Sequence, residues 1–208
     1  MTNASNDNHL FRPNSYIGRT VPRPNAKRLL NGRGNYTDDT KLPRMVHVAF
    51  LRSPHAHARI NKIDKNQAIK APGVVAVVDG HDIAKVCAPW VGVLAHLEGM
   101  KSAEQHALAI KKASWEGEPV VAIVASTRAL AEDALELIKV EWDILPVVTD
   151  MEDALEEDAE VIHESLGDNL AWRRTMDAGD VGASFDHAAH IIEERYISNR
   201  HTGVCPES

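Results

Sequence analysis

Seven apolar residues in a row, PVVAIVA (Pro119–Ala125), restrict the fold of this chain more than any other stretch does. A run of this length is far too short to span a bilayer, and it is typical of a β-strand that is buried on both faces. A strand of this kind needs a second layer of secondary structure on each side of its sheet. We therefore expect a layered fold with this strand at its centre.

An amphipathic helix and a second strand follow directly. Ser126 or Thr127 can cap the helix, because a side-chain oxygen at that position accepts a hydrogen bond from the first turn. The apolar positions of the helix share one stripe, at the spacing i, i+4, i+7 and i+8: Leu130, Ala134, Leu137 and Ile138. KVEWDIL (Lys139–Leu145) then returns as a strand, and Pro146 ends it. The pattern predicts a strand–helix–strand unit.

An earlier part of the chain repeats this order of elements. MVHVAFL (Met45–Leu51) and ARINKI (Ala58–Ile63) have strand character, and a short helix capped by Asp64 precedes VVAVV (Val74–Val78), which we predict to be a second buried strand. Two strand–helix–strand units indicate a mixed α/β domain of the α+β class over residues 18–150. Their crossovers would be right-handed if the strands are parallel. Residues 87–114 show no firm period and are expected to form a variable connection.

Three segments lie outside this domain. Residues 1–17 are polar and are expected to form a flexible arm. The acidic segment, residues 150–164, holds eight acids and no Lys or Arg, which is typical of a solvated short helix or linker. We expect an acidic linker over residues 151–180. For residues 181–208 we predict a helix over 182–189 and a strand over 191–198. The apolar residues of this strand would lack part of the protein surface that normally packs against them. Such an uncovered strand either pairs with a second copy or exchanges its amide protons quickly.

Composition and charge exclude several classes of protein. The composition is typical of a soluble globular protein, with 44% hydrophobic and 25% charged residues. No apolar run can cross a membrane and no signal peptide is evident, so we expect a cytoplasmic protein without a membrane span. Residues 1–62 hold 11 Lys and Arg against 3 Asp and Glu, but they lack the interleaving of aromatic and basic residues used for base stacking and any recognisable nucleic-acid motif. A basic face that docks on an acidic partner, or a solvated face, fits this charge better.

The stretch FLRSPHAHARI (Phe50–Ile60) raises the question of a metal site. His55 and His57 are two residues apart, so in a strand both imidazoles would share one face. Zinc or iron needs a third and usually a fourth ligand, and His47 is the nearest candidate. No carboxylate lies within the stretch, and Pro54 indicates a turn. We interpret it as a structural turn and keep a small metal-dependent enzyme using these three histidines as a weaker hypothesis.

Other motifs of chemistry are incomplete. NGRGN (Asn31–Asn35) lacks the third glycine and the preceding strand of a dinucleotide-binding loop. No glycine precedes Lys-Ser or Lys-Thr, and no serine stands in a nucleophile elbow. Cys87 and Cys205 form no disulfide framework and have no evident activating context. We therefore predict no catalytic, no cofactor-binding and no metal-binding residue in this chain.

Five blocks of sequence resemble one family, in its order. They are IGRTVPRPNAKRLLNGRGNYTDD, LPRMVHVAFLRSPHAHARI, PGVVAVVDGHDI, EGEPVVAIVASTRALAEDALELIKVEWDILPVVTD and GDVGASFDHAAHIIEERYISNRHTG. Together they extend from Ile17 to Gly203 and resemble the N-terminal region of the molybdenum-binding large subunit of the xanthine dehydrogenase / aldehyde oxidase family. Within this family, the sequence pattern most resembles the bacterial branch that includes carbon monoxide dehydrogenase.

The resemblance implies an α/β hammerhead domain over residues 18–150. It implies a truncated following domain, with residues 181–208 as the first elements of the molybdopterin-binding domain. Intact enzymes of this family are oxidoreductases that use water as oxygen source on an aldehyde, an N-heterocycle or carbon monoxide. Their molybdopterin cofactor is bound in the intact subunit, and iron-sulfur and FAD groups lie on partner subunits. This chain resembles only part of such an enzyme, because the family pattern breaks off at Cys205–Ser208, before the cofactor-binding loops.

We therefore expect a structural or docking piece that is inactive alone. Its expected partners are the iron-sulfur and FAD subunits, with self-association as a further possibility. The alternative hypothesis is a stand-alone, non-catalytic binding or assembly module with a hammerhead fold.

Overall fold

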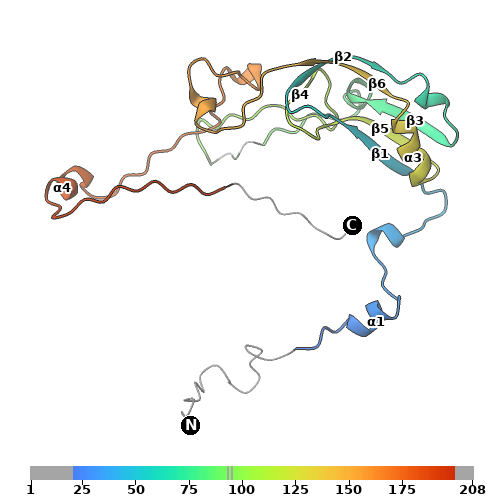
Figure 1. The fold of residues 1–208 in the computed structure, drawn as a ribbon, viewed down its shortest axis with the longest axis horizontal. Coiled ribbons are helices and arrows are strands. Elements are labelled where there is room, and N and C mark those ends of the chain that lie inside the picture. Colours follow the sequence, from blue (N-terminus) through green and yellow to red (C-terminus); the bar gives the residue numbers. More distant parts are fainter. Residues whose placement is uncertain (1–20, 93, 95, 200–208) are drawn as a thin grey trace, which may run out of the picture. The chain divides into compact units, whose positions relative to one another are not determined.

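The computed structural model describes residues 21–92, 94 and 96–199. The predicted N-terminal arm, residues 1–17, and Cys205 lie outside the described residues. The chain divides into two units, Met1–Pro43 with Arg195–Ser208, and Arg44–Glu194. The described part of the first unit contains helix α1 (Ala26–Leu30) and the 3₁₀ helix η1 (Thr37–Asp39). The named strands all belong to the second unit (Figure 1).

Strand β5 (Pro119–Ala125) is the central strand of a three-stranded antiparallel sheet. Its neighbours are β1 (His47–Arg52) and β3 (Val74–Asp79), in the order β1–β5–β3. The predicted run of apolar residues is confirmed as a strand, and four of its side chains are buried: Val120, Val121, Ile123 and Ala125. A second antiparallel sheet has the order β4–β2–β6, formed by β4 (Lys112–Ala113), β2 (Ala58–Asp64) and β6 (Lys139–Ile144). The mixed α/β fold class is thereby confirmed.

Both strand–helix–strand units pass from one sheet to the other. The first runs from β2 through the 3₁₀ helix η2 (Ala68–Lys70) to β3, and the second runs from β5 through α3 (Arg128–Leu135) to β6. The two strands of each unit therefore do not pair, and the parallel crossover that the pattern allowed does not form. Each strand instead pairs antiparallel with a strand from a distant part of the chain. These two crossings hold the sheets together.

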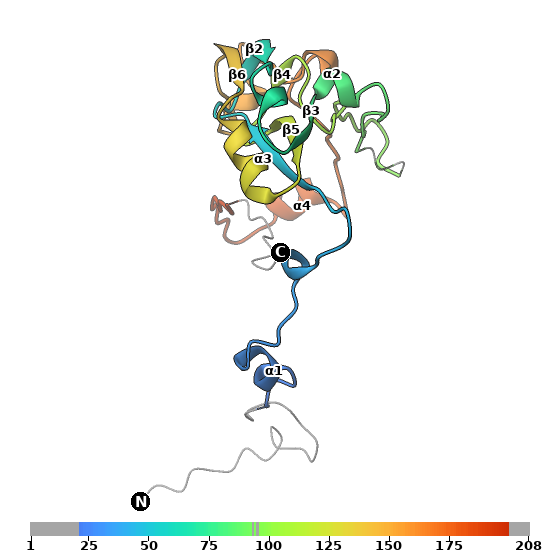
Figure 2. The same ribbon diagram turned by 90° about the vertical axis from the view of Figure 1, so that its right-hand side faces the viewer.

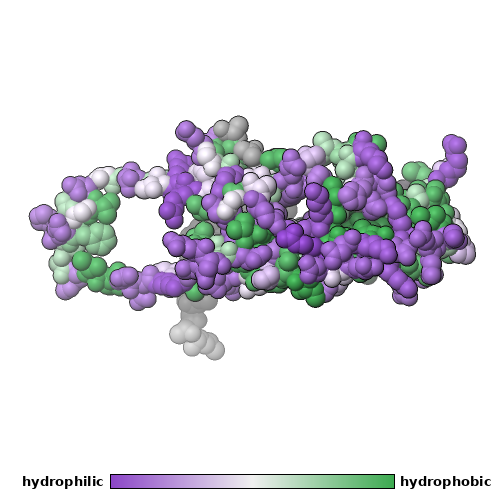
Figure 3. Space-filling view, turned by 90° about the horizontal axis from the view of Figure 1, so that it is seen from above, coloured by the Kyte–Doolittle hydropathy of each residue, from purple (hydrophilic) through white to green (hydrophobic). Residues whose placement is uncertain are grey.

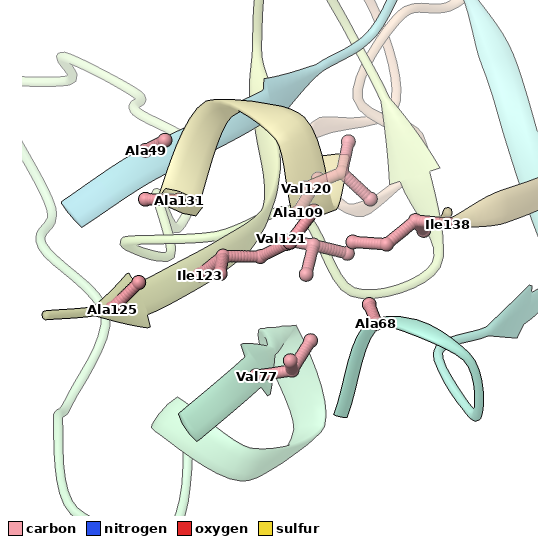
Figure 4. Close-up of a cluster of buried hydrophobic side chains, with 11 residues drawn as sticks. Ala49, Ala68, Val77, Ala109, Val120, Val121, Ile123, Ala125, Ala131 and Ile138 are labelled. Carbon is pink, nitrogen blue, oxygen red and sulfur yellow. The ribbon is translucent and has the colours of Figure 1, made fainter. Parts of the chain in front are cut away.

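Helix α3 covers one face of the β1–β5–β3 sheet, as Figure 2 shows. Thr127 begins the helix as predicted, and its Oγ1 accepts a hydrogen bond from the Leu130 amide at 3.3 Å. Ala131 and Ala134 point into the core, where they pack with a cluster of strand residues (Figure 4). The small alanine side chains let the helix backbone approach the sheet closely.

The predicted apolar stripe is wrong at Leu137. The helix ends at Leu135, and the chain then tightens, with the Leu137 amide bonded to the Ala134 carbonyl and the Ile138 amide to the Leu135 carbonyl. This tighter turn places Ile138 in the core and leaves Leu137 36% exposed. The helical period of 3.6 residues therefore applies only as far as Leu135, where the helix ends, and it does not apply at Leu137.

Two further predictions about β3 and residues 87–114 need correction. Strand β3 is an edge strand, with Val77 buried but Val75 66% exposed, so it is not buried on both faces. The connection over residues 87–114 contains β4 and supplies three buried residues, Leu108, Ala109 and Ala113. Between β3 and this connection lies the short helix α2 (Gly80–Ile83).

The C-terminal part of the described chain lies at the surface. The acidic stretch contains the 3₁₀ helices η3 (Asp153–Leu155) and η4 (Glu164–Leu166), followed by α4 (Val181–Asp186). The predicted strand over 191–198 is wrong: these residues form no strand and are exposed, because no neighbouring strand pairs with them. Figure 3 shows hydrophobic surface around α4, at the left of the view. No helix in the described ranges has the length and apolar character needed to cross a membrane.

Candidate functional site

The turn between β1 and β2 is fixed by Ser53. Its Oγ accepts a hydrogen bond from the His55 amide at 3.1 Å and donates to the His55 carbonyl at 2.7 Å. The Ser53 backbone makes two hydrogen bonds to the loop before β5. Its amide donates to the Glu118 carbonyl at 2.8 Å, and its carbonyl accepts from the Gly117 amide at 2.9 Å. Ser53 is itself buried. The segment SPHAH is therefore an ordered turn, joined to the start of the central strand.

The three candidate histidines have three different surroundings. His57 is buried, and its Nδ1 lies 2.7 Å from the Pro146 carbonyl oxygen, which requires the Nδ1–H tautomer because a carbonyl oxygen only accepts. His55 instead packs edge-to-face against Trp142, with 5.6 Å between ring centroids. His47 lies in β1 opposite Ala125. Across the part of the chain that the structure describes, no group of three or more His, Cys, Asp and Glu side chains is arranged to hold a metal ion.

A hollow of about 420 Å³ opens beside β4 and the start of β5. Several residues between 104 and 119 line it, together with His163 from the acidic segment. Glu118 is its principal acid: burial raises the pKa of this carboxyl, while its Oε2 accepts a hydrogen bond from the Ser114 amide at 2.6 Å. Sequence reasoning missed Glu118, because an isolated glutamate before an apolar run carries no motif.

Lys112 connects this hollow to the acidic segment. Its largely buried Nζ donates to the Ile162 carbonyl at 2.5 Å and to Glu164 Oε2 at 2.8 Å. That hydrogen bond lowers the pKa of Glu164. The pKa of His163 is lowered by burial and by the positive charge of Lys112. The charge of Lys112 is therefore already neutralised by protein groups, so it serves to attach the acidic segment to β4.

The side chains around the hollow do not form a catalytic set. Glu118 accepts a hydrogen bond from the Ser114 backbone amide, and Lys112 is paired with Glu164. Nor do the described residues offer a metal-ligand group that would fit a molybdenum centre.

A second charged cluster stabilises the start of α2. Lys65 Nζ donates to Asp79 at 2.7 Å and to Asp82 at 2.5 Å, and the Asp82 amide bonds Asp79 Oδ1 in a capping box. These hydrogen bonds lower the pKa of Asp82. Burial lowers the pKa of Lys65, but its bonds to the two aspartates outweigh that effect and leave the pKa raised. Each charge here has a local partner, which indicates a structural role.

The part of the chain that contains both sheets matches a known protein family. Residues 31–146, which include all six strands, match the family described as aldehyde oxidase and xanthine dehydrogenase, a/b hammerhead domain. This chain belongs to that family. The hammerhead fold expected from the sequence is confirmed.

Three relatives are similar to this chain, which we call the hammerhead chain, over part of their own length. The carbon monoxide dehydrogenase large chain of Hydrogenophaga pseudoflava is 43% identical over 70% of this chain and 18% of its own length. The xanthine dehydrogenase molybdenum-binding subunit of Escherichia coli O157:H7 is 34% identical over 84% of this chain and 23% of its own. The crystal structure of quinoline 2-oxidoreductase from Pseudomonas putida superposes with a TM-score of 0.73 at 40% identity, over 83% of this chain and 22% of that one. The hammerhead chain thus spans less than a quarter of the length of each relative.

Proposed function

We propose that this chain is the N-terminal hammerhead part of a molybdenum hydroxylase large subunit, with a structural and docking role. The observation that carries the proposal is the match of residues 31–146, all six strands included, to the hammerhead domain of this family. The absence of a metal-ligand group among the described residues fits a domain that supports a reaction carried out elsewhere in the subunit. We propose that the chain is inactive alone.

The remaining features of the intact enzyme follow from this assignment. The molybdopterin cofactor would be held by later parts of the subunit, and iron-sulfur and FAD groups would be held by partner subunits. The substrate would be an aldehyde, an N-heterocycle or carbon monoxide, with water as oxygen source, in the cytoplasm. Residues 18–150 would form the hammerhead domain, residues 151–180 a linker, and residues 181–208 the first elements of the cofactor domain.

A domain exchange tests the proposal. Residues 31–146 of this chain would replace the matched segment in the large subunit of quinoline 2-oxidoreductase from Pseudomonas putida. We expect the purified chimera to contain molybdenum and to retain turnover of quinoline, because the hammerhead segment supplies support and no ligand. A chimera that assembles but has lost molybdenum would contradict the proposed role.

Elemental analysis of the chain itself provides the complementary measurement. We expect neither molybdenum nor stoichiometric zinc after treatment with a chelator. About one metal ion per chain would support the small metal-dependent enzyme instead. A stand-alone module remains the second candidate, and it predicts an open reading frame that stops without the family's glycine-rich loops.

A further inference from the structure

The β1–β5–β3 sheet has a second apolar face, opposite the one that α3 covers. Alternate residues of each strand point to opposite faces, so the register defines both sets. Ala49, Ile123 and Val77 form one row on the side of α3 and the core. The opposite side carries two rows, Val48–Val124–Ala76 and Phe50–Ala122–Val78, which we call the open face.

The open face is apolar in every position and only half covered. Val48 is 50% exposed and Phe50 44% exposed, and the other four residues are half-buried. An antiparallel sheet that borders water on one side normally carries polar residues there. At its margin the Arg52 guanidinium lies 5.8 Å from the centre of the Phe50 ring, which gives the face a charged rim. This composition is typical of a surface that another protein surface covers.

We propose that, in the full-length large subunit, the open face is covered by an apolar surface from a later part of the same polypeptide. This inference rests on the proposed function. The chain spans between 12% and 24% of the length of its curated relatives, so most of such a relative lies outside the matched region.

The size of the open face favours an occupant on the same polypeptide over a second copy. Six side chains, none more than half exposed, offer far less than the ~800 Å² per partner that a stable interface between separate proteins buries. A covalently linked partner needs less contact area, because linkage replaces free association by a high effective concentration. A small apolar face thus suits contact within one polypeptide.

Thiol labelling measures whether the open face is covered. Val48→Cys would be made in this chain and in the quinoline 2-oxidoreductase chimera, with Cys87 replaced by Ser, and with Cys205 also replaced in this chain. Glu132→Cys, on an exposed position of α3, is the matched control for thiol access. In the chimera we expect labelling of Val48→Cys to slow by roughly tenfold or more relative to this chain, and labelling of the control to stay unchanged.

The outcomes separate this inference from the proposed function. A chimera that holds molybdenum but labels quickly at Val48→Cys leaves the proposed function intact and overturns the open-face assignment. Protection that depends on the concentration of this chain identifies a second copy, and protection only with the iron-sulfur subunit present identifies a separate partner; both overturn it. A chimera that assembles without molybdenum contradicts the proposed function, and labelling of this chain alone then tests the open face. Slow labelling of Val48→Cys at high dilution would mean that the face is already covered within this chain, which overturns the inference.

Discussion

Among single residues, Lys65 carries the clearest electrostatic role. It is the shared partner of Asp79 and Asp82, which come from the end of β3 and from α2. The lysine and Asp79 are partly buried, whereas Asp82 is more than a third exposed, so solvent screens part of the attraction. Lys65 therefore joins the end of one strand to the start of the next helix.

We predict that Lys65→Met lowers the free energy of unfolding by about 1 kcal/mol at pH 7. The lowered pKa of Asp82 means that its share of this stability is present above the unfolded pKa and is lost as the pH falls through the folded pKa. The difference between variant and wild type should therefore shrink below about pH 4. Urea unfolding at several pH values measures it. Lys62→Met, which breaks an exposed pair with Glu141, is the control and should change little.

Asn169 is the second residue with a clear individual role. Its Oδ1 accepts from the Ile162 amide at 3.0 Å, and its Nδ2 donates to the Ala154 and Glu160 carbonyls at 3.1 and 2.9 Å. We predict that Asn169→Ala accelerates amide exchange at Ile162, because the loop loses all three bonds. Asn169→Asp keeps the acceptor but turns a carboxylate oxygen toward the Ala154 and Glu160 carbonyls, so it should accelerate exchange as well. Equal exchange in all three proteins would show that other contacts, among them those of Lys112 and Lys101, hold this loop.

At the scale of elements, the core depends on β5 more than on the exposed end of α3. Ile123 is fully buried in the central strand, whereas Leu137 lies beyond the helix and is partly exposed. We predict that Ile123→Ala costs about 2–5 kcal/mol and Leu137→Ala less than about 1 kcal/mol. Chemical denaturation of both variants measures the two costs. Similar losses at the two positions would mean that α3 continues through Leu137.

Local patterns predicted the elements better than their partners. The apolar run of β5 and the cap at Thr127 have signals within a few residues, and both are present in the structure. The exposure of Val75 could not be read from VVAVV, because it depends on β3 being at the edge of its sheet. The raised pKa of Glu118 likewise depends on its burial in the fold, which no motif in the sequence indicates. Pairing and burial are set by the whole chain, whereas caps and strand runs are set locally.

For the whole molecule, the main contrast is between the sheets and the C-terminal described segment. The apolar residues of this segment are exposed: Ile191, Ile192, Tyr196 and Ile197. We predict fast amide exchange over 191–197 and strong protection in β5, because β5 has ladder bonds on both sides whereas residues 191–197 pair with no strand. Hydrogen exchange combined with a solution mass measurement tests this. Strong protection in a strict monomer would favour a stand-alone module, and protection in a dimer would indicate pairing of two copies.

The crossing of the chain between its two sheets also determines when it can fold. His47 pairs with Ala125, and Ala58 pairs with Ile144, so each early strand waits for a partner that is synthesised about 80 residues later. Proteins dominated by such distant pairings fold in milliseconds to seconds, because the loop must close before the contacts form. On the ribosome, β1 and β2 would emerge as unpaired strands and stay so until residues 119–144 follow. The nascent chain therefore exposes strand edges until β5 and β6 have been made, and chaperone binding during this interval would protect it from aggregation.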